Sequence, residues 1–542
     1  MEAKKSKRFF HNIIFFFLFI FADEVIAFSS PSFLTQPGFF RTSFEAVAMP
    51  QDSPRMGFLS MNYFTEISPW LYGGVGSYEA VSGNQGGFFT LGLGGGVHTP
   101  VVNHMQADLG FYAGGGGRQS SLVGGGLMLK PYLGLSYLWR STRFGLFYSY
   151  VNFSDGSIHS SQVGVSIDFL NQFDYFDSKY KNKTFSDLKE IIFPKDNYLV
   201  WQREDFSILL QGYQQLPGSR DLSGESQNNL IGLVGGELDH YINRYLFSWI
   251  RTDGAFSGIN NGYMDILAGL GYKRLFLGKK EIYVLAQLGA GAGGGGHVDT
   301  GGGILLQPQV GLEWPLISGF GMRVCGGYLW APDGHFQTTT ATLDLLYHLD
   351  IARCDKKQNR SSSCVQAPYF IQAWRVQMFN QTYLAPQRVA ANIDSAMNTF
   401  ALQLDQLFTD YFLMSYQAAS AYSGEHVGGY ASGMLGPGFQ FTFAQDDAIQ
   451  IFGNFFLGAA GGGGLALGSG GVIEPVLGLR YRCHSMWGLQ GSVGQMIAFH
   501  GGLSTAVFSV GVSVDLGLLR GKERSQDVSQ VHGCRGNDFC YQ

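Results

Sequence analysis

Charged residues and long apolar runs are both scarce in this sequence. Lys, Arg, Asp and Glu make up 14% of the 542 residues, against about 25% in a typical soluble domain. After residue 22, no apolar run reaches the ~18 residues that a membrane helix needs. The net charge is −5 and there is no basic patch, which argues against nucleic acid as a partner.

Cysteine is also sparse, with six residues in the chain. Cys354 and Cys364 bracket a polar segment, and Cys534 and Cys540 lie near the C-terminus. Each pair is close enough in sequence to close a small disulfide loop in an oxidising compartment. None of the cysteines has the spacing of a zinc site. We therefore predict two possible disulfides, no metal and no cofactor.

Glycine and aromatic residues are abundant. The chain has 77 glycines, 15% aromatic residues and a mean hydropathy of only +0.03. A transmembrane β-barrel has this composition, because its apolar residues occupy alternate positions instead of forming blocks. The sequence therefore predicts an all-β protein, an antiparallel transmembrane β-barrel.

The N-terminus has the three parts of a secretory signal peptide. The basic residues are Lys4, Lys5, Lys7 and Arg8. An apolar stretch covers residues 9–22, and Val25-Ile26-Ala27 offers a cleavage point. This order is typical of an export signal. We assign residues 1–27 to it.

Three glycine runs, 179 and 168 residues apart, mark an internal repeat. They are Gly114–Gly117, Gly293–Gly296 and Gly461–Gly464, and we expect hairpins at Gly114 and Gly115, Gly293 and Gly294, and Gly461 and Gly462. A Pro-x-x-Gly-Leu phrase follows each run, starting at Pro131, Pro308 and Pro475. An Ala-x-Ser-Gly phrase precedes each run, starting at Ala80, Ala255 and Ala421. Recurrence of these anchors in one order indicates triplication of a sheet-sized unit.

The repeats divide the chain. Turn-rich breaks in the first repeat separate eight predicted strands, at 40–49, 57–67, 70–81, 88–98, 104–113, 126–139, 142–153 and 161–170. The predicted units are β-barrel repeats over 38–170, 200–350 and 373–520, periplasmic linkers over 171–199 and 351–372, and a polar tail over 521–542. An even number of strands in each repeat would put both linkers and the tail on one side of the membrane, and the glycine runs on the other.

The strand after each glycine run segregates its charges. With Pro131 on the outer face, Leu133 and Leu135 also point outward, whereas Lys130 and Ser136 point inward. An ionised side chain facing lipid at mid-depth would cost about 2–4 kcal/mol, so a bilayer enforces this pattern. The residues predicted to line the lumen are Lys130, Ser136, Gln307, Glu313, Glu474 and Arg480.

Two arrangements fit about 24 strands in three repeats. One is a single barrel with a wide lumen, slightly favoured because the end strands of each repeat can pair with their neighbours. The other is three eight-stranded barrels, each filled by its own side chains. The first predicts a pore or export channel, and the second a structural or surface-binding protein.

The Tyr-Gly-Gly-Val-Gly-Ser-Tyr run at residues 72–78 and the phrase Gly124-Gly125-Gly126-Leu127 resemble outer-membrane β-barrel proteins of Gram-negative bacteria, especially small eight-stranded barrels. The resemblance covers nearly the whole mature chain and supplies no catalytic residues. It implies a porin-like place in the cell outer membrane, with lipid, lipopolysaccharide and the barrel assembly machinery as partners. Such barrels usually end on an aromatic residue in the last strand, whereas this chain continues from Arg520 to Gln542.

The glycine runs allow two interpretations. The simpler one is that they permit sharp hairpins and close approach of backbones. The other is that the three hairpins form a constriction around a pseudo-threefold axis. The prolines at 131, 308 and 475 favour a local break in the sheet, because proline cannot donate to the ladder.

An enzyme is the third possibility. His159-Ser160-Ser161 matches the His-x-Ser element of eight-stranded lipid A deacylases. No glutamate follows before Glu190, and the other repeats have no counterpart. A Ser-His pair without an orienting acid is incomplete. We therefore expect no enzymatic activity.

Overall fold

The computed structural model describes residues 31–51, 53–186, 191, 198–277, 281–316, 319–355, 366–389, 395–443 and 448–522. The predicted signal peptide, the tail beyond Lys522, and Cys364, Cys534 and Cys540 lie outside the described residues. Cys354 lies in a strand whose side chains are not described at that point. The two predicted disulfides therefore stay predictions. Among the described residues, no helix is long and apolar enough to cross a membrane.

Barrel 1 is formed by the first eight strands. Each pairs antiparallel with the next, and β1 also pairs with β8, so the sheet closes. The glycine loop carries the four-residue helix α2 (Ser120–Val123). The strands are β1 (Leu34–Val47), β2 (Met56–Ser68), β3 (Leu71–Ser82), β4 (Phe89–His98), β5 (Met105–Gly117), β6 (Met128–Trp139), β7 (Thr142–Phe153) and β8 (His159–Asp177).

Barrel 2 closes in the same way, through pairing of β10 with β17. A short 3-10 helix, η1 (Ser178–Tyr180), and β9 (Thr184–Phe185) precede it. Its strands are β10 (Tyr198–Gln215), β11 (Leu230–Tyr241), β12 (Leu246–Ser257), β13 (Met264–Leu277), β14 (Ile282–Gly294), β15 (Ile304–Pro315), β16 (Phe320–Trp330) and β17 (Gln337–Asp355).

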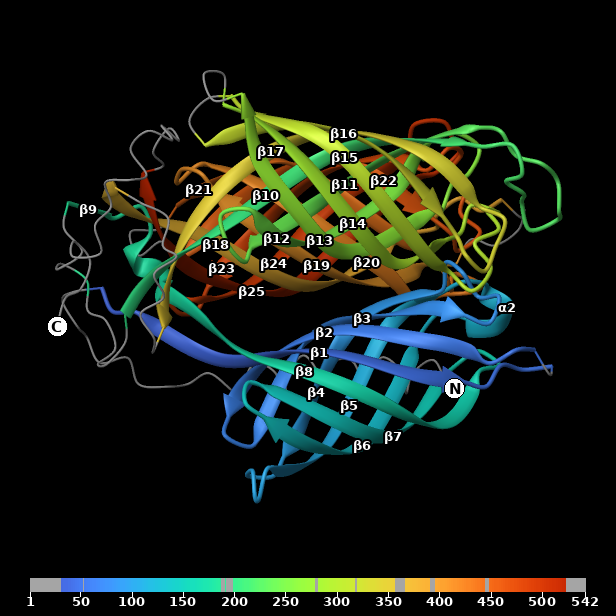
Figure 1. Ribbon diagram of the computed structural model, residues 1–542, viewed down its shortest axis with the longest axis horizontal. Coiled ribbons are helices and arrows are strands. Elements are labelled where there is room, and N and C mark those ends of the chain that lie inside the picture. Colours follow the sequence, from blue (N-terminus) through green and yellow to red (C-terminus); the bar gives the residue numbers. More distant parts are fainter. Residues whose placement is uncertain are drawn as a thin grey trace.

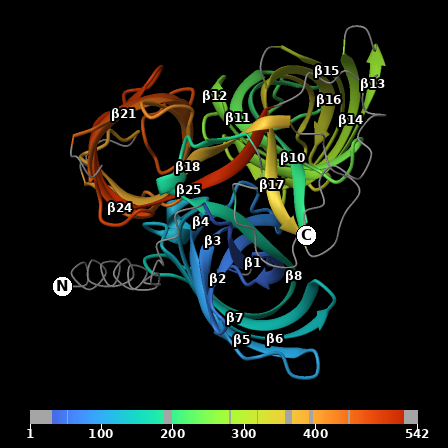
Figure 2. The same cartoon turned by 90° about the vertical axis from the view of Figure 1, so that its left-hand side faces the viewer.

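Barrel 3 closes through pairing of β18 with β25. Its strands are β18 (Gln366–Tyr383), β19 (Met397–Leu407), β20 (Phe412–Ser423), β21 (Ala431–Thr442), β22 (Ile449–Gly461), β23 (Gly471–Arg482), β24 (Trp487–Ala498) and β25 (Ser504–Lys522). Figure 1 shows barrel 1 below barrels 2 and 3, which overlap in that view, and Figure 2 looks at the barrel ends and shows three separate rings. The all-β antiparallel barrel architecture is therefore confirmed, and the single wide barrel does not form.

Side chains alternate across each barrel wall as β6 illustrates. Leu133 and Leu135 point outward and are 59% and 51% exposed, whereas Lys130 points inward and is 2% exposed. A soluble barrel would bury its apolar residues and expose its charges. The inverse distribution suits a wall with hydrocarbon outside and a polar filling inside.

The end strands of the barrels are longer than the sequence suggested. Residues 171–177, expected in a linker, complete β8, and residues 351–355 complete β17. Polar residues such as Asn171, Gln172 and Asp174 interrupt the apolar alternation and obscured the strand, but a ladder beyond the apolar band does not need strict alternation. These extensions join the barrels, because Gly517 of β25 pairs with Phe176 of β8, and Arg520 of β25 pairs with Ile351 of β17.

The strand ladder is broken at each of the three prolines where the sequence predicts a break, Pro131, Pro308 and Pro475. The pairing of β6 with β7 skips Lys130 and Pro131, and the equivalent ladders skip residues 307–308 and 474–475. Proline offers no N–H to the ladder, which accounts for the gap. The residue before each proline is one of the predicted lumen-lining positions.

Candidate functional site

We call the barrel end that carries the glycine runs the glycine rim, and the opposite end, which carries the connections between barrels, the linker rim. Two features could carry function: the interior of each barrel, and the contacts between barrels at the glycine rim. The interiors are described first.

The predicted lumen residues of barrel 1 are buried in its interior. Lys130 Nζ lies 3.0 Å from Glu45 Oε1 and donates a hydrogen bond of 3.2 Å to the hydroxyl of Tyr78. The hydroxyl of Ser136 donates to the carbonyl oxygen of Gln106 at 3.3 Å. Both side chains are thus engaged by other interior groups.

Barrel 2 has a dense interior ion network around Arg323. This guanidinium contacts Glu237 at 2.6 Å, Asp239 at 2.5 Å and Glu313 at 3.2 Å. Glu313 also pairs with Lys273 Nζ at 2.5 Å. Each buried carboxylate here is compensated by a cation, which offsets the cost of taking these charges out of water.

Gln307, the other predicted lumen residue of barrel 2, belongs to the same network. Its amide oxygen accepts a hydrogen bond from Arg251 at 3.0 Å, and Arg251 pairs with Glu237 at 2.5 Å. All three side chains are buried.

Barrel 3 uses fewer ions. Arg480 and Arg375 share Asp515, at 2.8 and 2.9 Å. Glu474 is also buried, and its Oε2 has no hydrogen-bond partner among the described residues. The charges predicted at equivalent positions therefore lie inside three separate barrels and form no shared ring.

An apolar cluster closes each barrel interior at the glycine rim. In barrel 2 the loop residues Val298 and Phe336 pack with Tyr213 of β10, and all three are at most 2% exposed. Equivalent clusters contain Val123 and Ile158 in barrel 1, and Leu465 and Leu503 in barrel 3. We call these three clusters the plugs. A solute entering from the linker rim would meet paired charges and then a plug.

The barrels contact one another in a cycle at the glycine rim. The turn after the third strand of each barrel docks on the glycine loop of the next barrel, and barrel 3 docks on barrel 1. Each interface contains a hydrogen bond of this kind: Gly86 N to Gly301 O at 3.0 Å, Ser469 Oγ to the carbonyl oxygen of Phe256 at the end of β12 at 3.1 Å, and Gly428 N to Gly124 O at 3.0 Å.

The same close backbone approach recurs in all three interfaces. In each, a glycine with φ between +93° and +103° faces an alanine carbonyl oxygen, and a Cβ on that glycine would lie 2.3–2.5 Å from the oxygen. The pairs are Gly303 with Ala80, Gly470 with Ala255, and Gly126 with Ala421. Only glycine fits here, both because of its φ and because of the space.

The predicted rim glycines lie at these interfaces or just behind them. A Cβ on Gly115, Gly294 or Gly461 would meet backbone of a neighbouring barrel, whereas one on Gly114, Gly293 or Gly462 would first meet its own barrel. All of Gly114–Gly117 lies in β5, as strand and not as a hairpin tip. The runs therefore lie between barrels.

The phrase Ala-x-Ser-Gly marks the repeat in the sequence, but its role becomes visible only in the structure. Its alanine supplies the carbonyl oxygen that the next barrel's glycine approaches. The sequence signal for a contact between repeats is that this phrase recurs in each repeat together with the glycine that a neighbouring barrel places against it, namely Gly126, Gly303 or Gly470.

The residues of the possible deacylase element do not form a catalytic Ser-His pair in the structure. His159 begins β8 and its Nδ1 lies 2.6 Å from Asn152 Oδ1 at the exposed rim. The hydroxyl of Ser160 points into barrel 1, donating to Gln162 at 2.7 Å and accepting from the backbone N–H of Ala48 at 2.8 Å. The structure shows no hydrogen bond between His159 and Ser160, both of which lie in the described part of the chain.

No family model matches the sequence, and no curated protein matches it. Among solved structures, the copper transporter OprC is 10% identical with a TM-score of 0.27, covering 91% of this chain and 82% of that one. The siderophore receptor PirA from Acinetobacter baumannii is 8% identical with a TM-score of 0.26, covering 89% and 80%. OccK11 (OpdR) from Pseudomonas aeruginosa is 9% identical with a TM-score of 0.20, covering 89% and 96%. At these scores the likenesses carry no argument about function.

Proposed function

We propose that this chain is an integral β-barrel protein of a Gram-negative outer membrane, built by internal triplication, and that it acts as a structural or surface-binding platform. The observation that carries the proposal is the inside-out distribution of side chains: apolar residues cover the outer walls, while each barrel interior holds buried ion pairs and a plug.

Exposed aromatic side chains near the linker rim support the membrane assignment. Aromatic residues favour the boundary between hydrocarbon and water. The most exposed ones at this rim are Trp70, Trp139, Phe276, Tyr411 and Phe443.

Loop lengths support an orientation with the glycine rim outside the cell. At the linker rim, β2 and β3 are joined by residues 69–70, and β6 and β7 by residues 140–141. At the glycine rim, residues 216–229 join β10 and β11. Bacterial outer-membrane barrels have short periplasmic turns and longer extracellular loops.

A pore was the first function that the sequence suggested, and planar-bilayer conductance of the purified full chain tests it against the platform. We expect no stable openings, because each barrel interior holds buried ion pairs and a plug. Large, long-lived openings would overturn the platform and favour solute passage.

Labelling of intact cells tests the orientation. Ser223 lies in an exposed glycine-rim loop and Cys483 in an exposed linker-rim turn. We expect a membrane-impermeant maleimide to label the variant Ser223→Cys above the wild-type level in intact cells. Labelling of Cys483 should require permeabilised cells and disappear in Cys483→Ser. The reverse pattern would contradict the orientation.

A further inference from the structure

The outer wall of barrel 3 carries a cluster of polar side chains near the glycine rim. The four side chains come from the neighbouring strands β18, β19 and β20, and all are half-buried: Asn380, Thr382, Asn398 and Tyr422. They point outward, because Asn380 is paired across the ladder with Val510 of β25, which is 68% exposed. We call this set the polar cluster.

The equivalent positions of the other two barrels are not polar. The Ala-x-Ser-Gly phrase fixes the correspondence, because its serine pairs with Asn398 in barrel 3 and with a glycine in each of the other barrels. In the order Asn380, Thr382, Asn398 and Tyr422, the counterparts are Phe44, Ala46, Gly57 and Val81 in barrel 1, and Leu210, Gly212, Gly232 and Phe256 in barrel 2. The polar cluster therefore replaces an apolar stretch of the repeated wall.

The hydrogen bonds of the polar cluster run in one direction. The hydroxyl of Tyr422 donates to Asn380 Oδ1 at 2.7 Å, and Asn380 Nδ2 donates to Thr382 Oγ1 at 3.1 Å. The hydroxyl of Thr382 donates in turn to Asn398 Oδ1 at 2.7 Å. The amide nitrogen of Asn398 donates to no residue that the structure describes, although an amide carries two N–H donors. The series therefore ends in a donor that needs an acceptor.

The polar cluster lies at the end of the apolar wall. Thr382 is the last residue but one of β18, and Asn398 is the second residue of β19. Beside them Phe508, the ladder partner of Thr382, is 46% exposed. In a membrane, this end of the wall lies where hydrocarbon gives way to polar groups. An N–H donor at this depth that finds no acceptor costs free energy.

The chemistry of the polar cluster selects its ligand. None of the four side chains carries a cationic group, and phosphates are bound preferentially by arginine and lysine. An amide N–H beside exposed apolar residues suits a neutral oxygen attached to a hydrocarbon chain. Tyr422 also follows Ala421, whose carbonyl oxygen meets Gly126 of barrel 1. A ligand here would lie beside the seam between barrels 3 and 1, the two barrels that no linker joins.

We propose that the polar cluster binds an acyl chain of lipopolysaccharide through the carbonyl or hydroxyl oxygen near its attachment, at a single site on barrel 3. The site rests on the membrane location and orientation proposed above, which put the glycine rim in the outer leaflet. Acyl chains of lipopolysaccharide are attached through amide and ester carbonyls and carry hydroxyl groups close to them. Asn398 Nδ2 donates to one of these oxygens, while Phe508 and Val510 contact the hydrocarbon.

Native mass spectrometry of the full chain, purified in detergent from the outer-membrane fraction and mixed with equal amounts of lipopolysaccharide and phosphatidylglycerol, tests this site. We expect the wild type to retain one lipopolysaccharide in preference to the phospholipid. In the double variant Asn380→Leu/Thr382→Ala, retention should fall at least about fivefold, because the hydrogen bonds that orient Asn398 are lost. Thr339→Leu is the matched control, since Thr339 is an exposed polar residue of barrel 2 outside the cluster.

A second variant, Asn398→Ala, removes the terminal donor alone. The wall should tolerate it, because the other barrels have glycine at this position, and we expect the same loss of lipopolysaccharide. Equal retention by the wild type and both variants, or equal retention of the two lipids by the wild type, would overturn the site. A chain missing from the outer-membrane fraction would contradict the proposed function instead, so the two failures are distinguishable.

Discussion

The barrel interiors and the interfaces between barrels differ in how closely they repeat. In all three interfaces a glycine with a positive φ lies against an alanine carbonyl oxygen. The distance from a Cβ on that glycine to the oxygen is nearly the same each time. The interiors place Lys130, Gln307 and Glu474 at one equivalent position, with three different charges. The position is the same, but the chemistry is not.

This difference separates two requirements. Where the backbones of two rigid barrel walls nearly touch, only glycine can occupy the contact position, because a single Cβ would fill the gap. An interior allows any set of side chains that fills the volume and pairs its charges. The interior side chains therefore need only fill the barrel and pair its charges, whereas the interface residues determine how the barrels pack against one another.

The largest effect should come from removing the central cation of barrel 2. Arg323→Met leaves the carboxylates around Arg323 under-compensated, and breaking a buried ion pair from one side costs about 3–5 kcal/mol. The free energy of unfolding in urea, measured on protein refolded in lipid, checks this. Arg353→Met is the control, because Arg353 is 45% exposed in its pair with Glu204, and Glu204 keeps its contact with His240 Nδ1 at 2.8 Å, so the loss should be at most about 1 kcal/mol. Equal losses in both variants would indicate a hydrated interior.

The next effect concerns an interface. Gly126→Ala places a methyl group against the carbonyl oxygen of Ala421, and we expect a loss of about 1–3 kcal/mol from overpacking. Hydrogen exchange should speed up in residues 424–429. Gly464→Ala is the matched control, because Gly464 also has a positive φ, of +63°, but a methyl group there would meet no atom within 4 Å. If both variants behave alike, backbone strain and not barrel contact explains the loss.

The smallest effect should come from a neutral interior group in barrel 3. Gln417 donates a hydrogen bond of 3.2 Å to Gln403. Gln417→Met removes this bond and the bond of 3.4 Å that Gln417 accepts from Gln381 while keeping the volume, so we expect a loss of about 1–2 kcal/mol in the free energy of unfolding. A loss as large as that of Arg323→Met would mean that interior ion pairs add nothing beyond packing.

Much of the wall could be predicted from the sequence. The eight strands of barrel 1 lie where turn residues and alternation placed them, apart from their ends, and the prolines marked the breaks in the ladders. Alternation works because period-two patterning reports directly on which side chain faces lipid. It fails at strand ends such as residues 171–177, which lie where no apolar band constrains the pattern.

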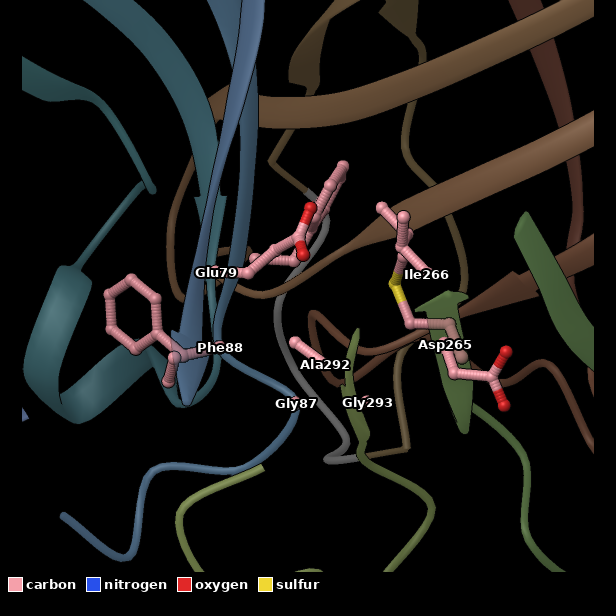
Figure 3. A pocket seen from close by; sticks show the side chains of 10 residues that line it. Glu79, Gly87, Phe88, Asp265, Ile266, Ala292 and Gly293 are labelled. Carbon is pink, nitrogen blue, oxygen red and sulfur yellow. The ribbon is translucent and has the colours of Figure 1, made fainter. Parts of the chain in front are cut away.

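Closure could not be predicted in this way. A strand in a wide barrel and one in a narrow barrel have the same alternation, and the difference lies in which end strands pair. Pairing of β10 with β17 leaves no mark on residue type. Partners such as Arg323 and Glu237 are likewise set by the curvature of a closed wall. Glu79, which is buried where barrels 1 and 2 meet (Figure 3), does leave a signal in the sequence, because an acidic residue on the outward-facing side of its strand breaks the charge rule.

The cyclic contact has a consequence for the order of the chain. Barrels 1 and 2 are joined by a linker and by docking, and so are barrels 2 and 3, but barrels 3 and 1 meet without a linker between them. Since the docking runs in one direction around the ring, no barrel is first or last in space. A circularly permuted gene that keeps the predicted signal peptide at its new N-terminus, with the remaining ends joined and new ends opened between β17 and β18, should encode the same assembly.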